Sequence, residues 1–296
     1  MRRNSEQGFS MVELMVASAT LLVLLGAVLT FFSRGQVVYT SERATLDMVQ
    51  DMRTVFDRFT NEIRMAGAGL PAPRGVILGS TTTLVVRGDF KEIATIVTST
   101  GSITIGATAT FPVGSTTGFA ANQTISLLNN EKGWAVLAKI TAIDAGNKTI
   151  TIDANDLLPL TAGTTITDFG AGSIINVIER RTYSIITDGD NKGAITRAIA
   201  YEDTQSAGTV IQSAETIATN VLDENGNPGL TFTYYQADGT SALNADGSLN
   251  PDVTKKVQIQ LKARSANPDL ESGKYRTFTY TALVQVRGQY APGVGF

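Results

Sequence analysis

The chain lacks two residue types that carry much of protein chemistry, because none of its 296 residues is cysteine or histidine. Without cysteine, no disulfide can stabilise the fold and the redox compartment cannot be inferred from thiols. Without histidine, the chain has no ordinary general base near neutral pH, no ligand of the type commonest in zinc sites, and no Ser-His or Cys-His pair. Carboxylate and lysine chemistry remain open, but no pairing in the sequence indicates either. We therefore expect a protein that is not an enzyme, with no metal site or cofactor.

Clusters of basic residues are missing as well. The formal net charge is −3, and no stretch gathers four or more lysines and arginines. Direct binding to nucleic acid is therefore not predicted. Hydrophobic residues make up 43% of the chain, which is enough for an anchor and the cores of one or two modest domains.

What the sequence does have is a long apolar run near its start. The 19 residues from Leu14 to Phe32 include no charged side chain. A helix rises about 1.5 Å per residue, so this run crosses most of a hydrocarbon layer roughly 30 Å thick. A transmembrane helix is predicted, and the basic Arg2 and Arg3 before it place the amino terminus on the cytoplasmic side. No small-residue cleavage site follows the run, unlike an ordinary secretory signal.

Glu13 is unusual in this segment, because it is a charged residue between apolar ones. The largely apolar residues Phe9 to Val12 precede it, and the charge-free run follows it directly. An unpaired acidic group in a membrane helix costs on the order of 3 kcal/mol, so it needs a partner. The alternative is that Glu13 lies at headgroup level and is solvated.

The stretch Gly8-Phe9-Ser10-Met11-Val12-Glu13, with a short basic leader before it and the apolar run after it, closely resembles the class III signal of type IV prepilins and type II secretion pseudopilins. The resemblance implies cleavage between Gly8 and Phe9 by a prepilin peptidase and N-methylation of Phe9. It also implies that Glu13 pairs with the terminal ammonium of Phe9 on a neighbouring subunit during assembly. Implied partners are the peptidase, other major and minor pilins, and the assembly platform of the inner membrane.

Beyond the membrane the helix is predicted to continue as an amphipathic one. Apolar residues at helical spacing predict a stripe that packs on the chain's own domain: Leu46, Val49, Met52, Phe56, Phe59 and Ile63. Charged residues are assigned to the opposite, solvent-exposed face: Glu42, Arg43, Asp47, Asp51, Arg58 and Glu62. The glycines and proline of residues 66–71 are expected to end the helix.

The segment from Arg53 to Gly67 carries a second resemblance, to the end of the first helix in PilW-type minor pilins and J-type minor pseudopilins. An acidic residue, an arginine and Ala-Gly close the helix there, and the matching residues are Glu62, Arg64, Ala66 and Gly67. This resemblance favours a minor subunit at a priming or tip-proximal position.

After Pro73 the pattern becomes that of β-strands, with short runs rich in Val, Ile and Thr between turn residues. Strands are predicted at 84–87, 93–97, 102–105, 124–128, 134–143, 148–152, 174–186, 194–201, 209–221, 230–235, 253–264 and 274–286. The last six are expected to form one antiparallel meander over the helix stripe. A turn at 145–147 is expected to join two strands of a hairpin.

The predicted organisation is a leader at 1–8, a helix at 9–70, a globular β domain at 71–97 and 169–296, and an inserted β module at 98–168. Trp134 in this module is expected to be half-buried, and the alternative is an aromatic contact for a ligand. Two acidic loops, 188–193 and 223–228, resemble parts of calcium loops but lack ligands, so turns are favoured.

These features together predict an α+β, pilin-like fold in which a long N-terminal helix packs on an antiparallel sheet that carries a β-rich insertion. The favoured function is a minor pilin of a type IV pilus, anchored once in the inner membrane before assembly and extracellular afterwards. A type II secretion pseudopilin, with a periplasmic filament, is the closest alternative. A membrane-anchored protein whose β module captures a carbohydrate or surface partner is the third.

Overall fold

The computed structural model describes residues 10–70, 75–104, 107–129, 134–153, 165–187, 193–201, 210–223, 225–265, 268 and 273–286. Over these residues one long helix precedes fifteen strands, and every strand pairing is antiparallel, which confirms the α+β class. The elements are α1 (Met11–Met65), β1 (Val76–Gly79), β2 (Thr83–Gly88), β3 (Ala94–Ile96), β4 (Gly101–Thr104), β5 (Thr108–Pro112), β6 (Thr124–Asn129), β7 (Trp134–Asp144), β8 (Thr149–Asp153), β9 (Thr165–Phe169), β10 (Ile174–Thr187), β11 (Gly193–Tyr201), β12 (Val210–Ala218), β13 (Leu230–Tyr235), β14 (Lys256–Arg264) and β15 (Thr277–Gln285).

Helix α1 ends where glycine permits the chain to turn. Ala66 caps the helix, and Gly67 and Gly69 follow with φ of 87° and 71°. Such left-handed conformations are cheap only for glycine. The amide of Gly67 donates to the carbonyl of Arg87 at 2.8 Å, which ties the helix end to β2.

The largest sheet has ten strands and is organised around β10. Residues 179–187 of this strand pair with β11, and 179–184 pair with β2 on the other side. Residues 174–178 pair instead with β6, and 174–176 with β3. One continuous strand therefore belongs both to the sheet under the helix and to the β-rich end of the molecule.

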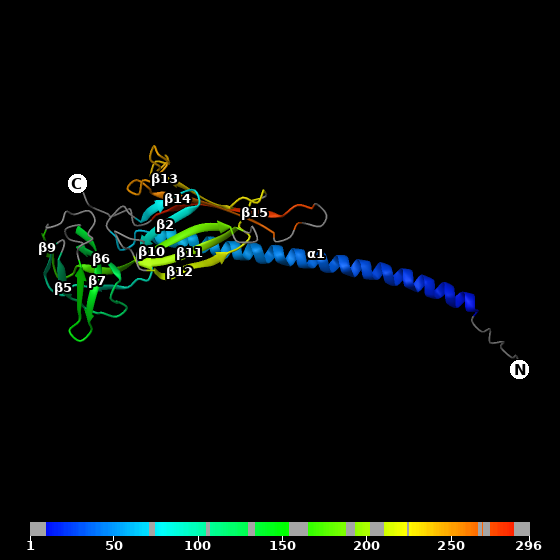
Figure 1. Ribbon diagram of the computed structural model, residues 1–296, viewed down its shortest axis with the longest axis horizontal. Helices are drawn as coiled ribbons and strands as arrows, with labels where there is room; N and C mark the ends of the chain where they lie inside the picture. Colours follow the sequence, from blue (N-terminus) through cyan, green and yellow to red (C-terminus); the bar gives the residue numbers. More distant parts are fainter. Residues whose placement is uncertain are drawn as a thin grey trace.

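The prediction of a single meander from Ile174 to Val286 is wrong in its sheet assignment. Strands β10, β11 and β12 are neighbours in the large sheet, whereas β13, β14 and β15 form a separate three-stranded sheet. Figure 1 shows the second half of α1 lying beside both groups of strands, while its first half projects away from them. The helix stripe is thus covered by two sheets.

The main core confirms most of the predicted stripe and corrects two of the assignments on this helix. Phe59, fully buried, contacts Tyr183 of β10 and Phe232 of β13, with ring centroids 4.5 and 6.2 Å apart, so it touches both sheets. The stripe predicts a buried Leu46, but 67% of this residue is exposed. The charge pattern predicts a solvent-facing Glu62, but only 7% of this residue is exposed.

A second, separate core lies in the β-rich end of the molecule. Its fully buried members include Ile103, Phe111, Ile125, Ile152 and Phe169. Figure 1 places the labelled strands of this end, β5, β6, β7 and β9, far from the N-terminal half of α1. The domain limits derived from the sequence remain predictions.

The predicted turn at 145–147 is confirmed, since it joins the paired strands β7 and β8. The Asp144 carboxylate accepts hydrogen bonds from the backbone and side chain of Asn147, at 2.9 and 2.7 Å, and these bonds lower the pKa of Asp144. Asp238 and Asp246 form similar turns with Thr240 and Ser248. Aspartate is favoured at such positions because its carboxylate can bond to backbone N–H groups a few residues on.

Candidate assembly site

The first described turn of α1 contains Glu13, the acidic residue on which the prepilin resemblance depends. Ser10 caps the helix, and its hydroxyl accepts from the Val12 amide at 3.3 Å. Glu13 reaches back, and its Oε2 accepts from the Ser10 amide at 3.0 Å. This reciprocal capping box satisfies two backbone donors that a helix start leaves unpaired. Gly8, Phe9, Arg2 and Arg3 lie outside the described residues.

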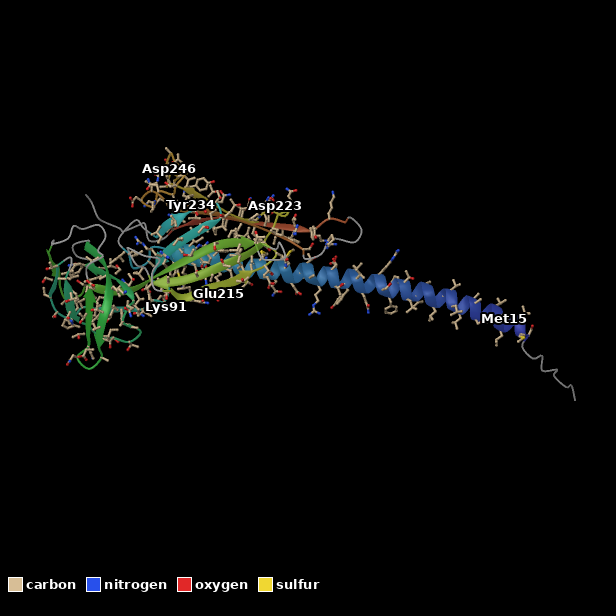
Figure 2. The ribbon with its side chains drawn as sticks, in the orientation of Figure 1. Met15, Lys91, Glu215, Asp223, Tyr234 and Asp246 are labelled. Atoms are coloured by element: carbon tan, nitrogen blue, oxygen red, sulfur yellow. The ribbon has the colours of Figure 1, made fainter. Side chains whose placement is uncertain are left out.

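The apolar half of α1 has no packing partner among the described residues. Every residue from Met11 to Thr40 is exposed, including Leu24 at 63% and Phe31 at 79%. Figure 2 shows the side chains of this half projecting around the helix without contact to the strands. By length and composition the helix can cross a membrane, as predicted.

The serine and threonine hydroxyl groups in this half are satisfied inside the helix. Ser18, Thr20, Thr30 and Ser33 each donate to a backbone carbonyl three or four residues earlier, at 2.8 to 3.0 Å. A hydroxyl that already has its acceptor costs less to bury in hydrocarbon than a free one. The charge-free run is therefore compatible with lipid or with a bundle of similar helices.

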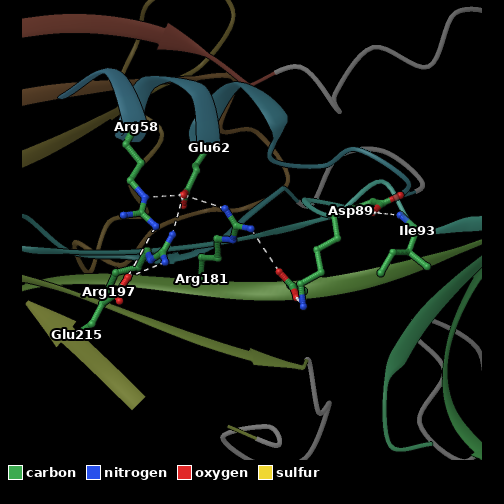
Figure 3. Close-up of polar contacts among 9 residues, drawn as sticks. Arg58, Glu62, Asp89, Ile93, Arg181, Arg197 and Glu215 are labelled. Carbon is green, nitrogen blue, oxygen red and sulfur yellow. Dashed lines mark hydrogen bonds and ion pairs between the residues drawn. The ribbon is translucent and has the colours of Figure 1, made fainter. Parts of the chain in front are cut away.

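At the other end of α1, Glu62 joins the helix to the large sheet. Its Oε1 lies 2.9 Å from Arg181 Nη1 and 3.0 Å from Arg197 Nη1, and 3.3 Å from Arg58 Nε (Figure 3). Arg181 is on β10 and Arg197 is on β11, and their side chains are only 12% and 7% exposed. A buried carboxylate with these partners pins the last turns of α1 to two strands.

The ion pairs continue on both sides of Glu62. Arg197 Nη2 lies 2.6 Å from Glu215 Oε1 on β12. Arg181 Nη2 lies 3.3 Å from Glu179 Oε2, and Lys91 Nζ lies 2.6 Å from Glu179 Oε1. These ion pairs form the buried charge network, named for its buried members Glu62, Glu179, Arg181 and Arg197; its outer members Arg58, Lys91 and Glu215 are partly exposed. The network connects the helix, three neighbouring strands and the segment after β2.

One sequence signal could have located Glu62 in this network. It lies three residues after Phe59 and directly before Ile63, both fully buried, so its helical phase places it on the packed face. Assigning it to the polar face gave its charge more weight than its position. Arg64, by contrast, is exposed, and Ala66 and Gly67 are buried at the helix end.

The described part of the chain gives no group of three or more acidic side chains placed to hold a metal ion. In the second acidic loop, Asp223 Oδ1 accepts from the amides of Asn225 and Asn227 at 2.8 Å, and Oδ2 accepts from the Asn227 side chain at 3.1 Å. These bonds, chiefly those from Asn227, lower the pKa of Asp223. Residues 188–192, Glu224 and the side chain of Trp134 lie outside the described residues.

Comparison with known proteins adds no family to these observations, since no family model, curated protein or solved structure matches the chain. A proposed function must explain two features of α1. One is the exposed apolar half with Glu13 at its start, and the other is the buried charge network at the C-terminal end of the helix.

Proposed function

We propose that this chain is a minor pilin of a type IV pilus. It is held in the inner membrane by the first half of α1, cut between Gly8 and Phe9 by a prepilin peptidase, and assembled at a priming or tip-proximal position. The observation that carries the proposal is the junction of Gly8, Phe9 and Glu13 with a helix half that exposes apolar residues on all sides. Such a surface is stable only in lipid or among similar helices.

The capping box suggests how Glu13 serves before and after assembly. Only Oε2 is used to cap the chain's own helix, which leaves Oε1 to accept from the ammonium of Phe9 on an adjacent subunit. Between apolar helices that contact is a buried charge pair and fixes the axial register of the subunits. The apolar side chains provide the contact area between subunits, and the charge pair fixes their axial position.

A substitution of Glu13 tests this role. Glu13→Ala should leave cleavage at Gly8 intact and reduce incorporation into filaments by roughly a hundredfold, because an unpaired buried charge costs on the order of 3 kcal/mol. Incorporation is measured as the fraction of the processed protein recovered in sheared filaments. The matched control is Glu42→Ala on the exposed part of the same helix, which should incorporate normally. Normal incorporation of Glu13→Ala counts against the proposal.

A type II secretion pseudopilin is the second candidate, because the same junction serves both systems. The two are separated by where the assembled protein is found. A pilus subunit is recovered in filaments sheared from the cell surface, whereas a pseudopilin stays in the periplasm and its loss impairs protein secretion.

A membrane-anchored binding protein is the third candidate, and the second core favours it. The β-rich end has its own buried residues and lies far from the apolar half of α1, so it is suited to display (Figure 1). An uncut chain with unmethylated Phe9 supports this candidate over the other two.

A further inference from the structure

Strand β15 presents a long edge that is open among the described residues. It pairs with β14 over all nine of its residues, from Lys256↔Gln285 to Arg264↔Thr277, without a register shift. The flanking amide of Ser265 donates to the carbonyl of Arg276, and that of Val286 donates to the carbonyl of Lys255. Antiparallel pairs alternate in their bonding, so Phe278, Tyr280, Ala282 and Val284 turn their backbone groups toward β14.

The backbone groups of the alternate residues therefore point away from the sheet. These residues are Thr277, Thr279, Thr281, Leu283 and Gln285, and all are exposed. Over the described ranges, no backbone hydrogen bond reaches them from outside β14. Within the described part of the chain they form a regular row of unpaired N–H and C=O groups, which is the template that another strand requires.

Three other edge strands in the described part of the chain, β13, β12 and β5, are blunted. The outer edge of β13 is occupied, since Phe232 donates to Thr81 and Tyr234 accepts from Ala242. The pairing of β12 is interrupted by register shifts, and β5 ends in Pro112. By contrast, β15 contains no charge, proline or bulge, so it lacks the usual devices that prevent pairing.

Helix α1 leaves apolar surface beside this edge. Arg276 Nη1 lies 3.2 Å from Glu42, and Tyr280 contacts Phe56 with ring centroids 5.7 Å apart. One side of α1 therefore follows β15 in the same direction. Leu46 lies on that side, one turn after Glu42, and is 67% exposed. Phe278 and Tyr280 of β15 are only half-buried. A strand added to β15 would cover all three.

We propose that β15 is a docking site for an extended segment of another protein, which adds a strand to the three-stranded sheet. The chemistry calls for apolar residues at alternate positions, facing Leu46, Phe278 and Tyr280, with small polar residues between them. A second copy is disfavoured, because antiparallel pairing of two β15 strands would point their α1 helices in opposite directions. The argument against a second copy rests on the proposed anchoring of α1 in one membrane. The observation that the edge of β15 is open does not rest on it.

Residue-resolved hydrogen exchange on the full chain in detergent micelles tests the docking site. In the free chain the amides of Thr279, Thr281 and Leu283 should exchange nearly unprotected, while those of Phe278, Tyr280 and Ala282 are slower by about a hundredfold or more. The probe is a nine-residue peptide of alternating threonine and valine, N-methylated along one edge. It should slow the three outward amides at least about tenfold, and a fully N-methylated peptide should not.

The variant Thr281→Pro removes one outward donor without breaking a bond to β14, and Thr281→Ala keeps that donor. Protection by the peptide should be lost in the first variant and kept in the second. Outward amides that are already protected in the free chain, or are unaffected by the peptide, overturn the proposal. A Thr281→Cys chain has no other cysteine. Disulfide-linked dimers of this variant would show that the edge of β15 pairs with a second copy of the chain and not with another protein. None of these outcomes depends on cleavage or filament assembly.

Discussion

Replacing Glu62 with alanine should lower the free energy of unfolding by about 3 kcal/mol or more, because it leaves buried guanidinium groups without their shared anion. Arg181 and Arg197 are at most 12% exposed and lie within 3.0 Å of Glu62 Oε1. Each keeps one other carboxylate, Glu179 or Glu215, so the loss should lie near the lower end of the range of about 3 to 5 kcal/mol for a broken buried ion pair. Urea unfolding of the full chain in micelles, followed by circular dichroism, measures the change.

The matched control for Glu62 is Glu42, on the same helix. Its ion pair with Arg276, 3.2 Å long, joins side chains that are 57% and 42% exposed. Solvent screening limits such pairs to less than about 1 kcal/mol. Equal effects of Glu62→Ala and Glu42→Ala would contradict the buried network. Because Arg197 shares the network, Arg197→Ala combined with Glu62→Ala should cost less than the sum of the two single changes.

Replacing Phe59 with alanine should cost about 3 to 5 kcal/mol, since it removes a fully buried aromatic side chain and leaves a cavity. The ring lies between Tyr183 of the large sheet and Phe232 of the three-stranded sheet, so the cavity opens where α1 meets both. The same unfolding measurement gives the change in free energy.

Leu46 provides the control for Phe59, because the sequence pattern places both in one apolar stripe. With 67% of Leu46 exposed, Leu46→Ala should change the unfolding free energy by less than about 0.5 kcal/mol. A large loss from Leu46→Ala, or a small one from Phe59→Ala, would mean that a different side of α1 packs on the sheets.

Local patterns were sufficient to predict most individual strands. The range 230–235 coincides with β13, and the alternation of Val257, Ile259 and Leu261 with polar residues matches the buried and half-buried positions of β14. Alternation of apolar and polar residues indicates which side of a strand is buried, and this pattern depends only on residues two apart in the sequence. Strands β1, β5 and β9 were missed. They are only four or five residues long, and β5 ends in proline.

The pairing of strands could not be read from the same patterns. Nothing in the alternation of β12 and β13 shows that they belong to different sheets, because alternation indicates the buried side of each strand and not which strand lies beside it. The helical phase of Glu62 indicates that it is buried, but no pattern indicates its partners. Its partner Arg197 is 135 residues away in sequence, so only the folded chain brings the two charges together.

The predicted cleavage and assembly residues are a different case, since they rest on resemblance and not on a derived geometry. The structure adds the capping box of Glu13 and the exposed apolar helix around it, but Gly8 and Phe9 lie outside the described residues. Among the described residues, the buried charge network joins α1 to the large sheet, and β10 continues from that sheet into the β-rich end. Helix α1 and the β-rich end are therefore connected through β10.

The N-terminal mass of the protein isolated from its native membrane or filament tests the central claim most directly. We expect a mature chain that begins at Phe9 and carries one methyl group on its amino terminus, with residues 1–8 removed. A chain that retains Gly8 and the residues before it, or that begins elsewhere, would contradict the assignment to the prepilin class.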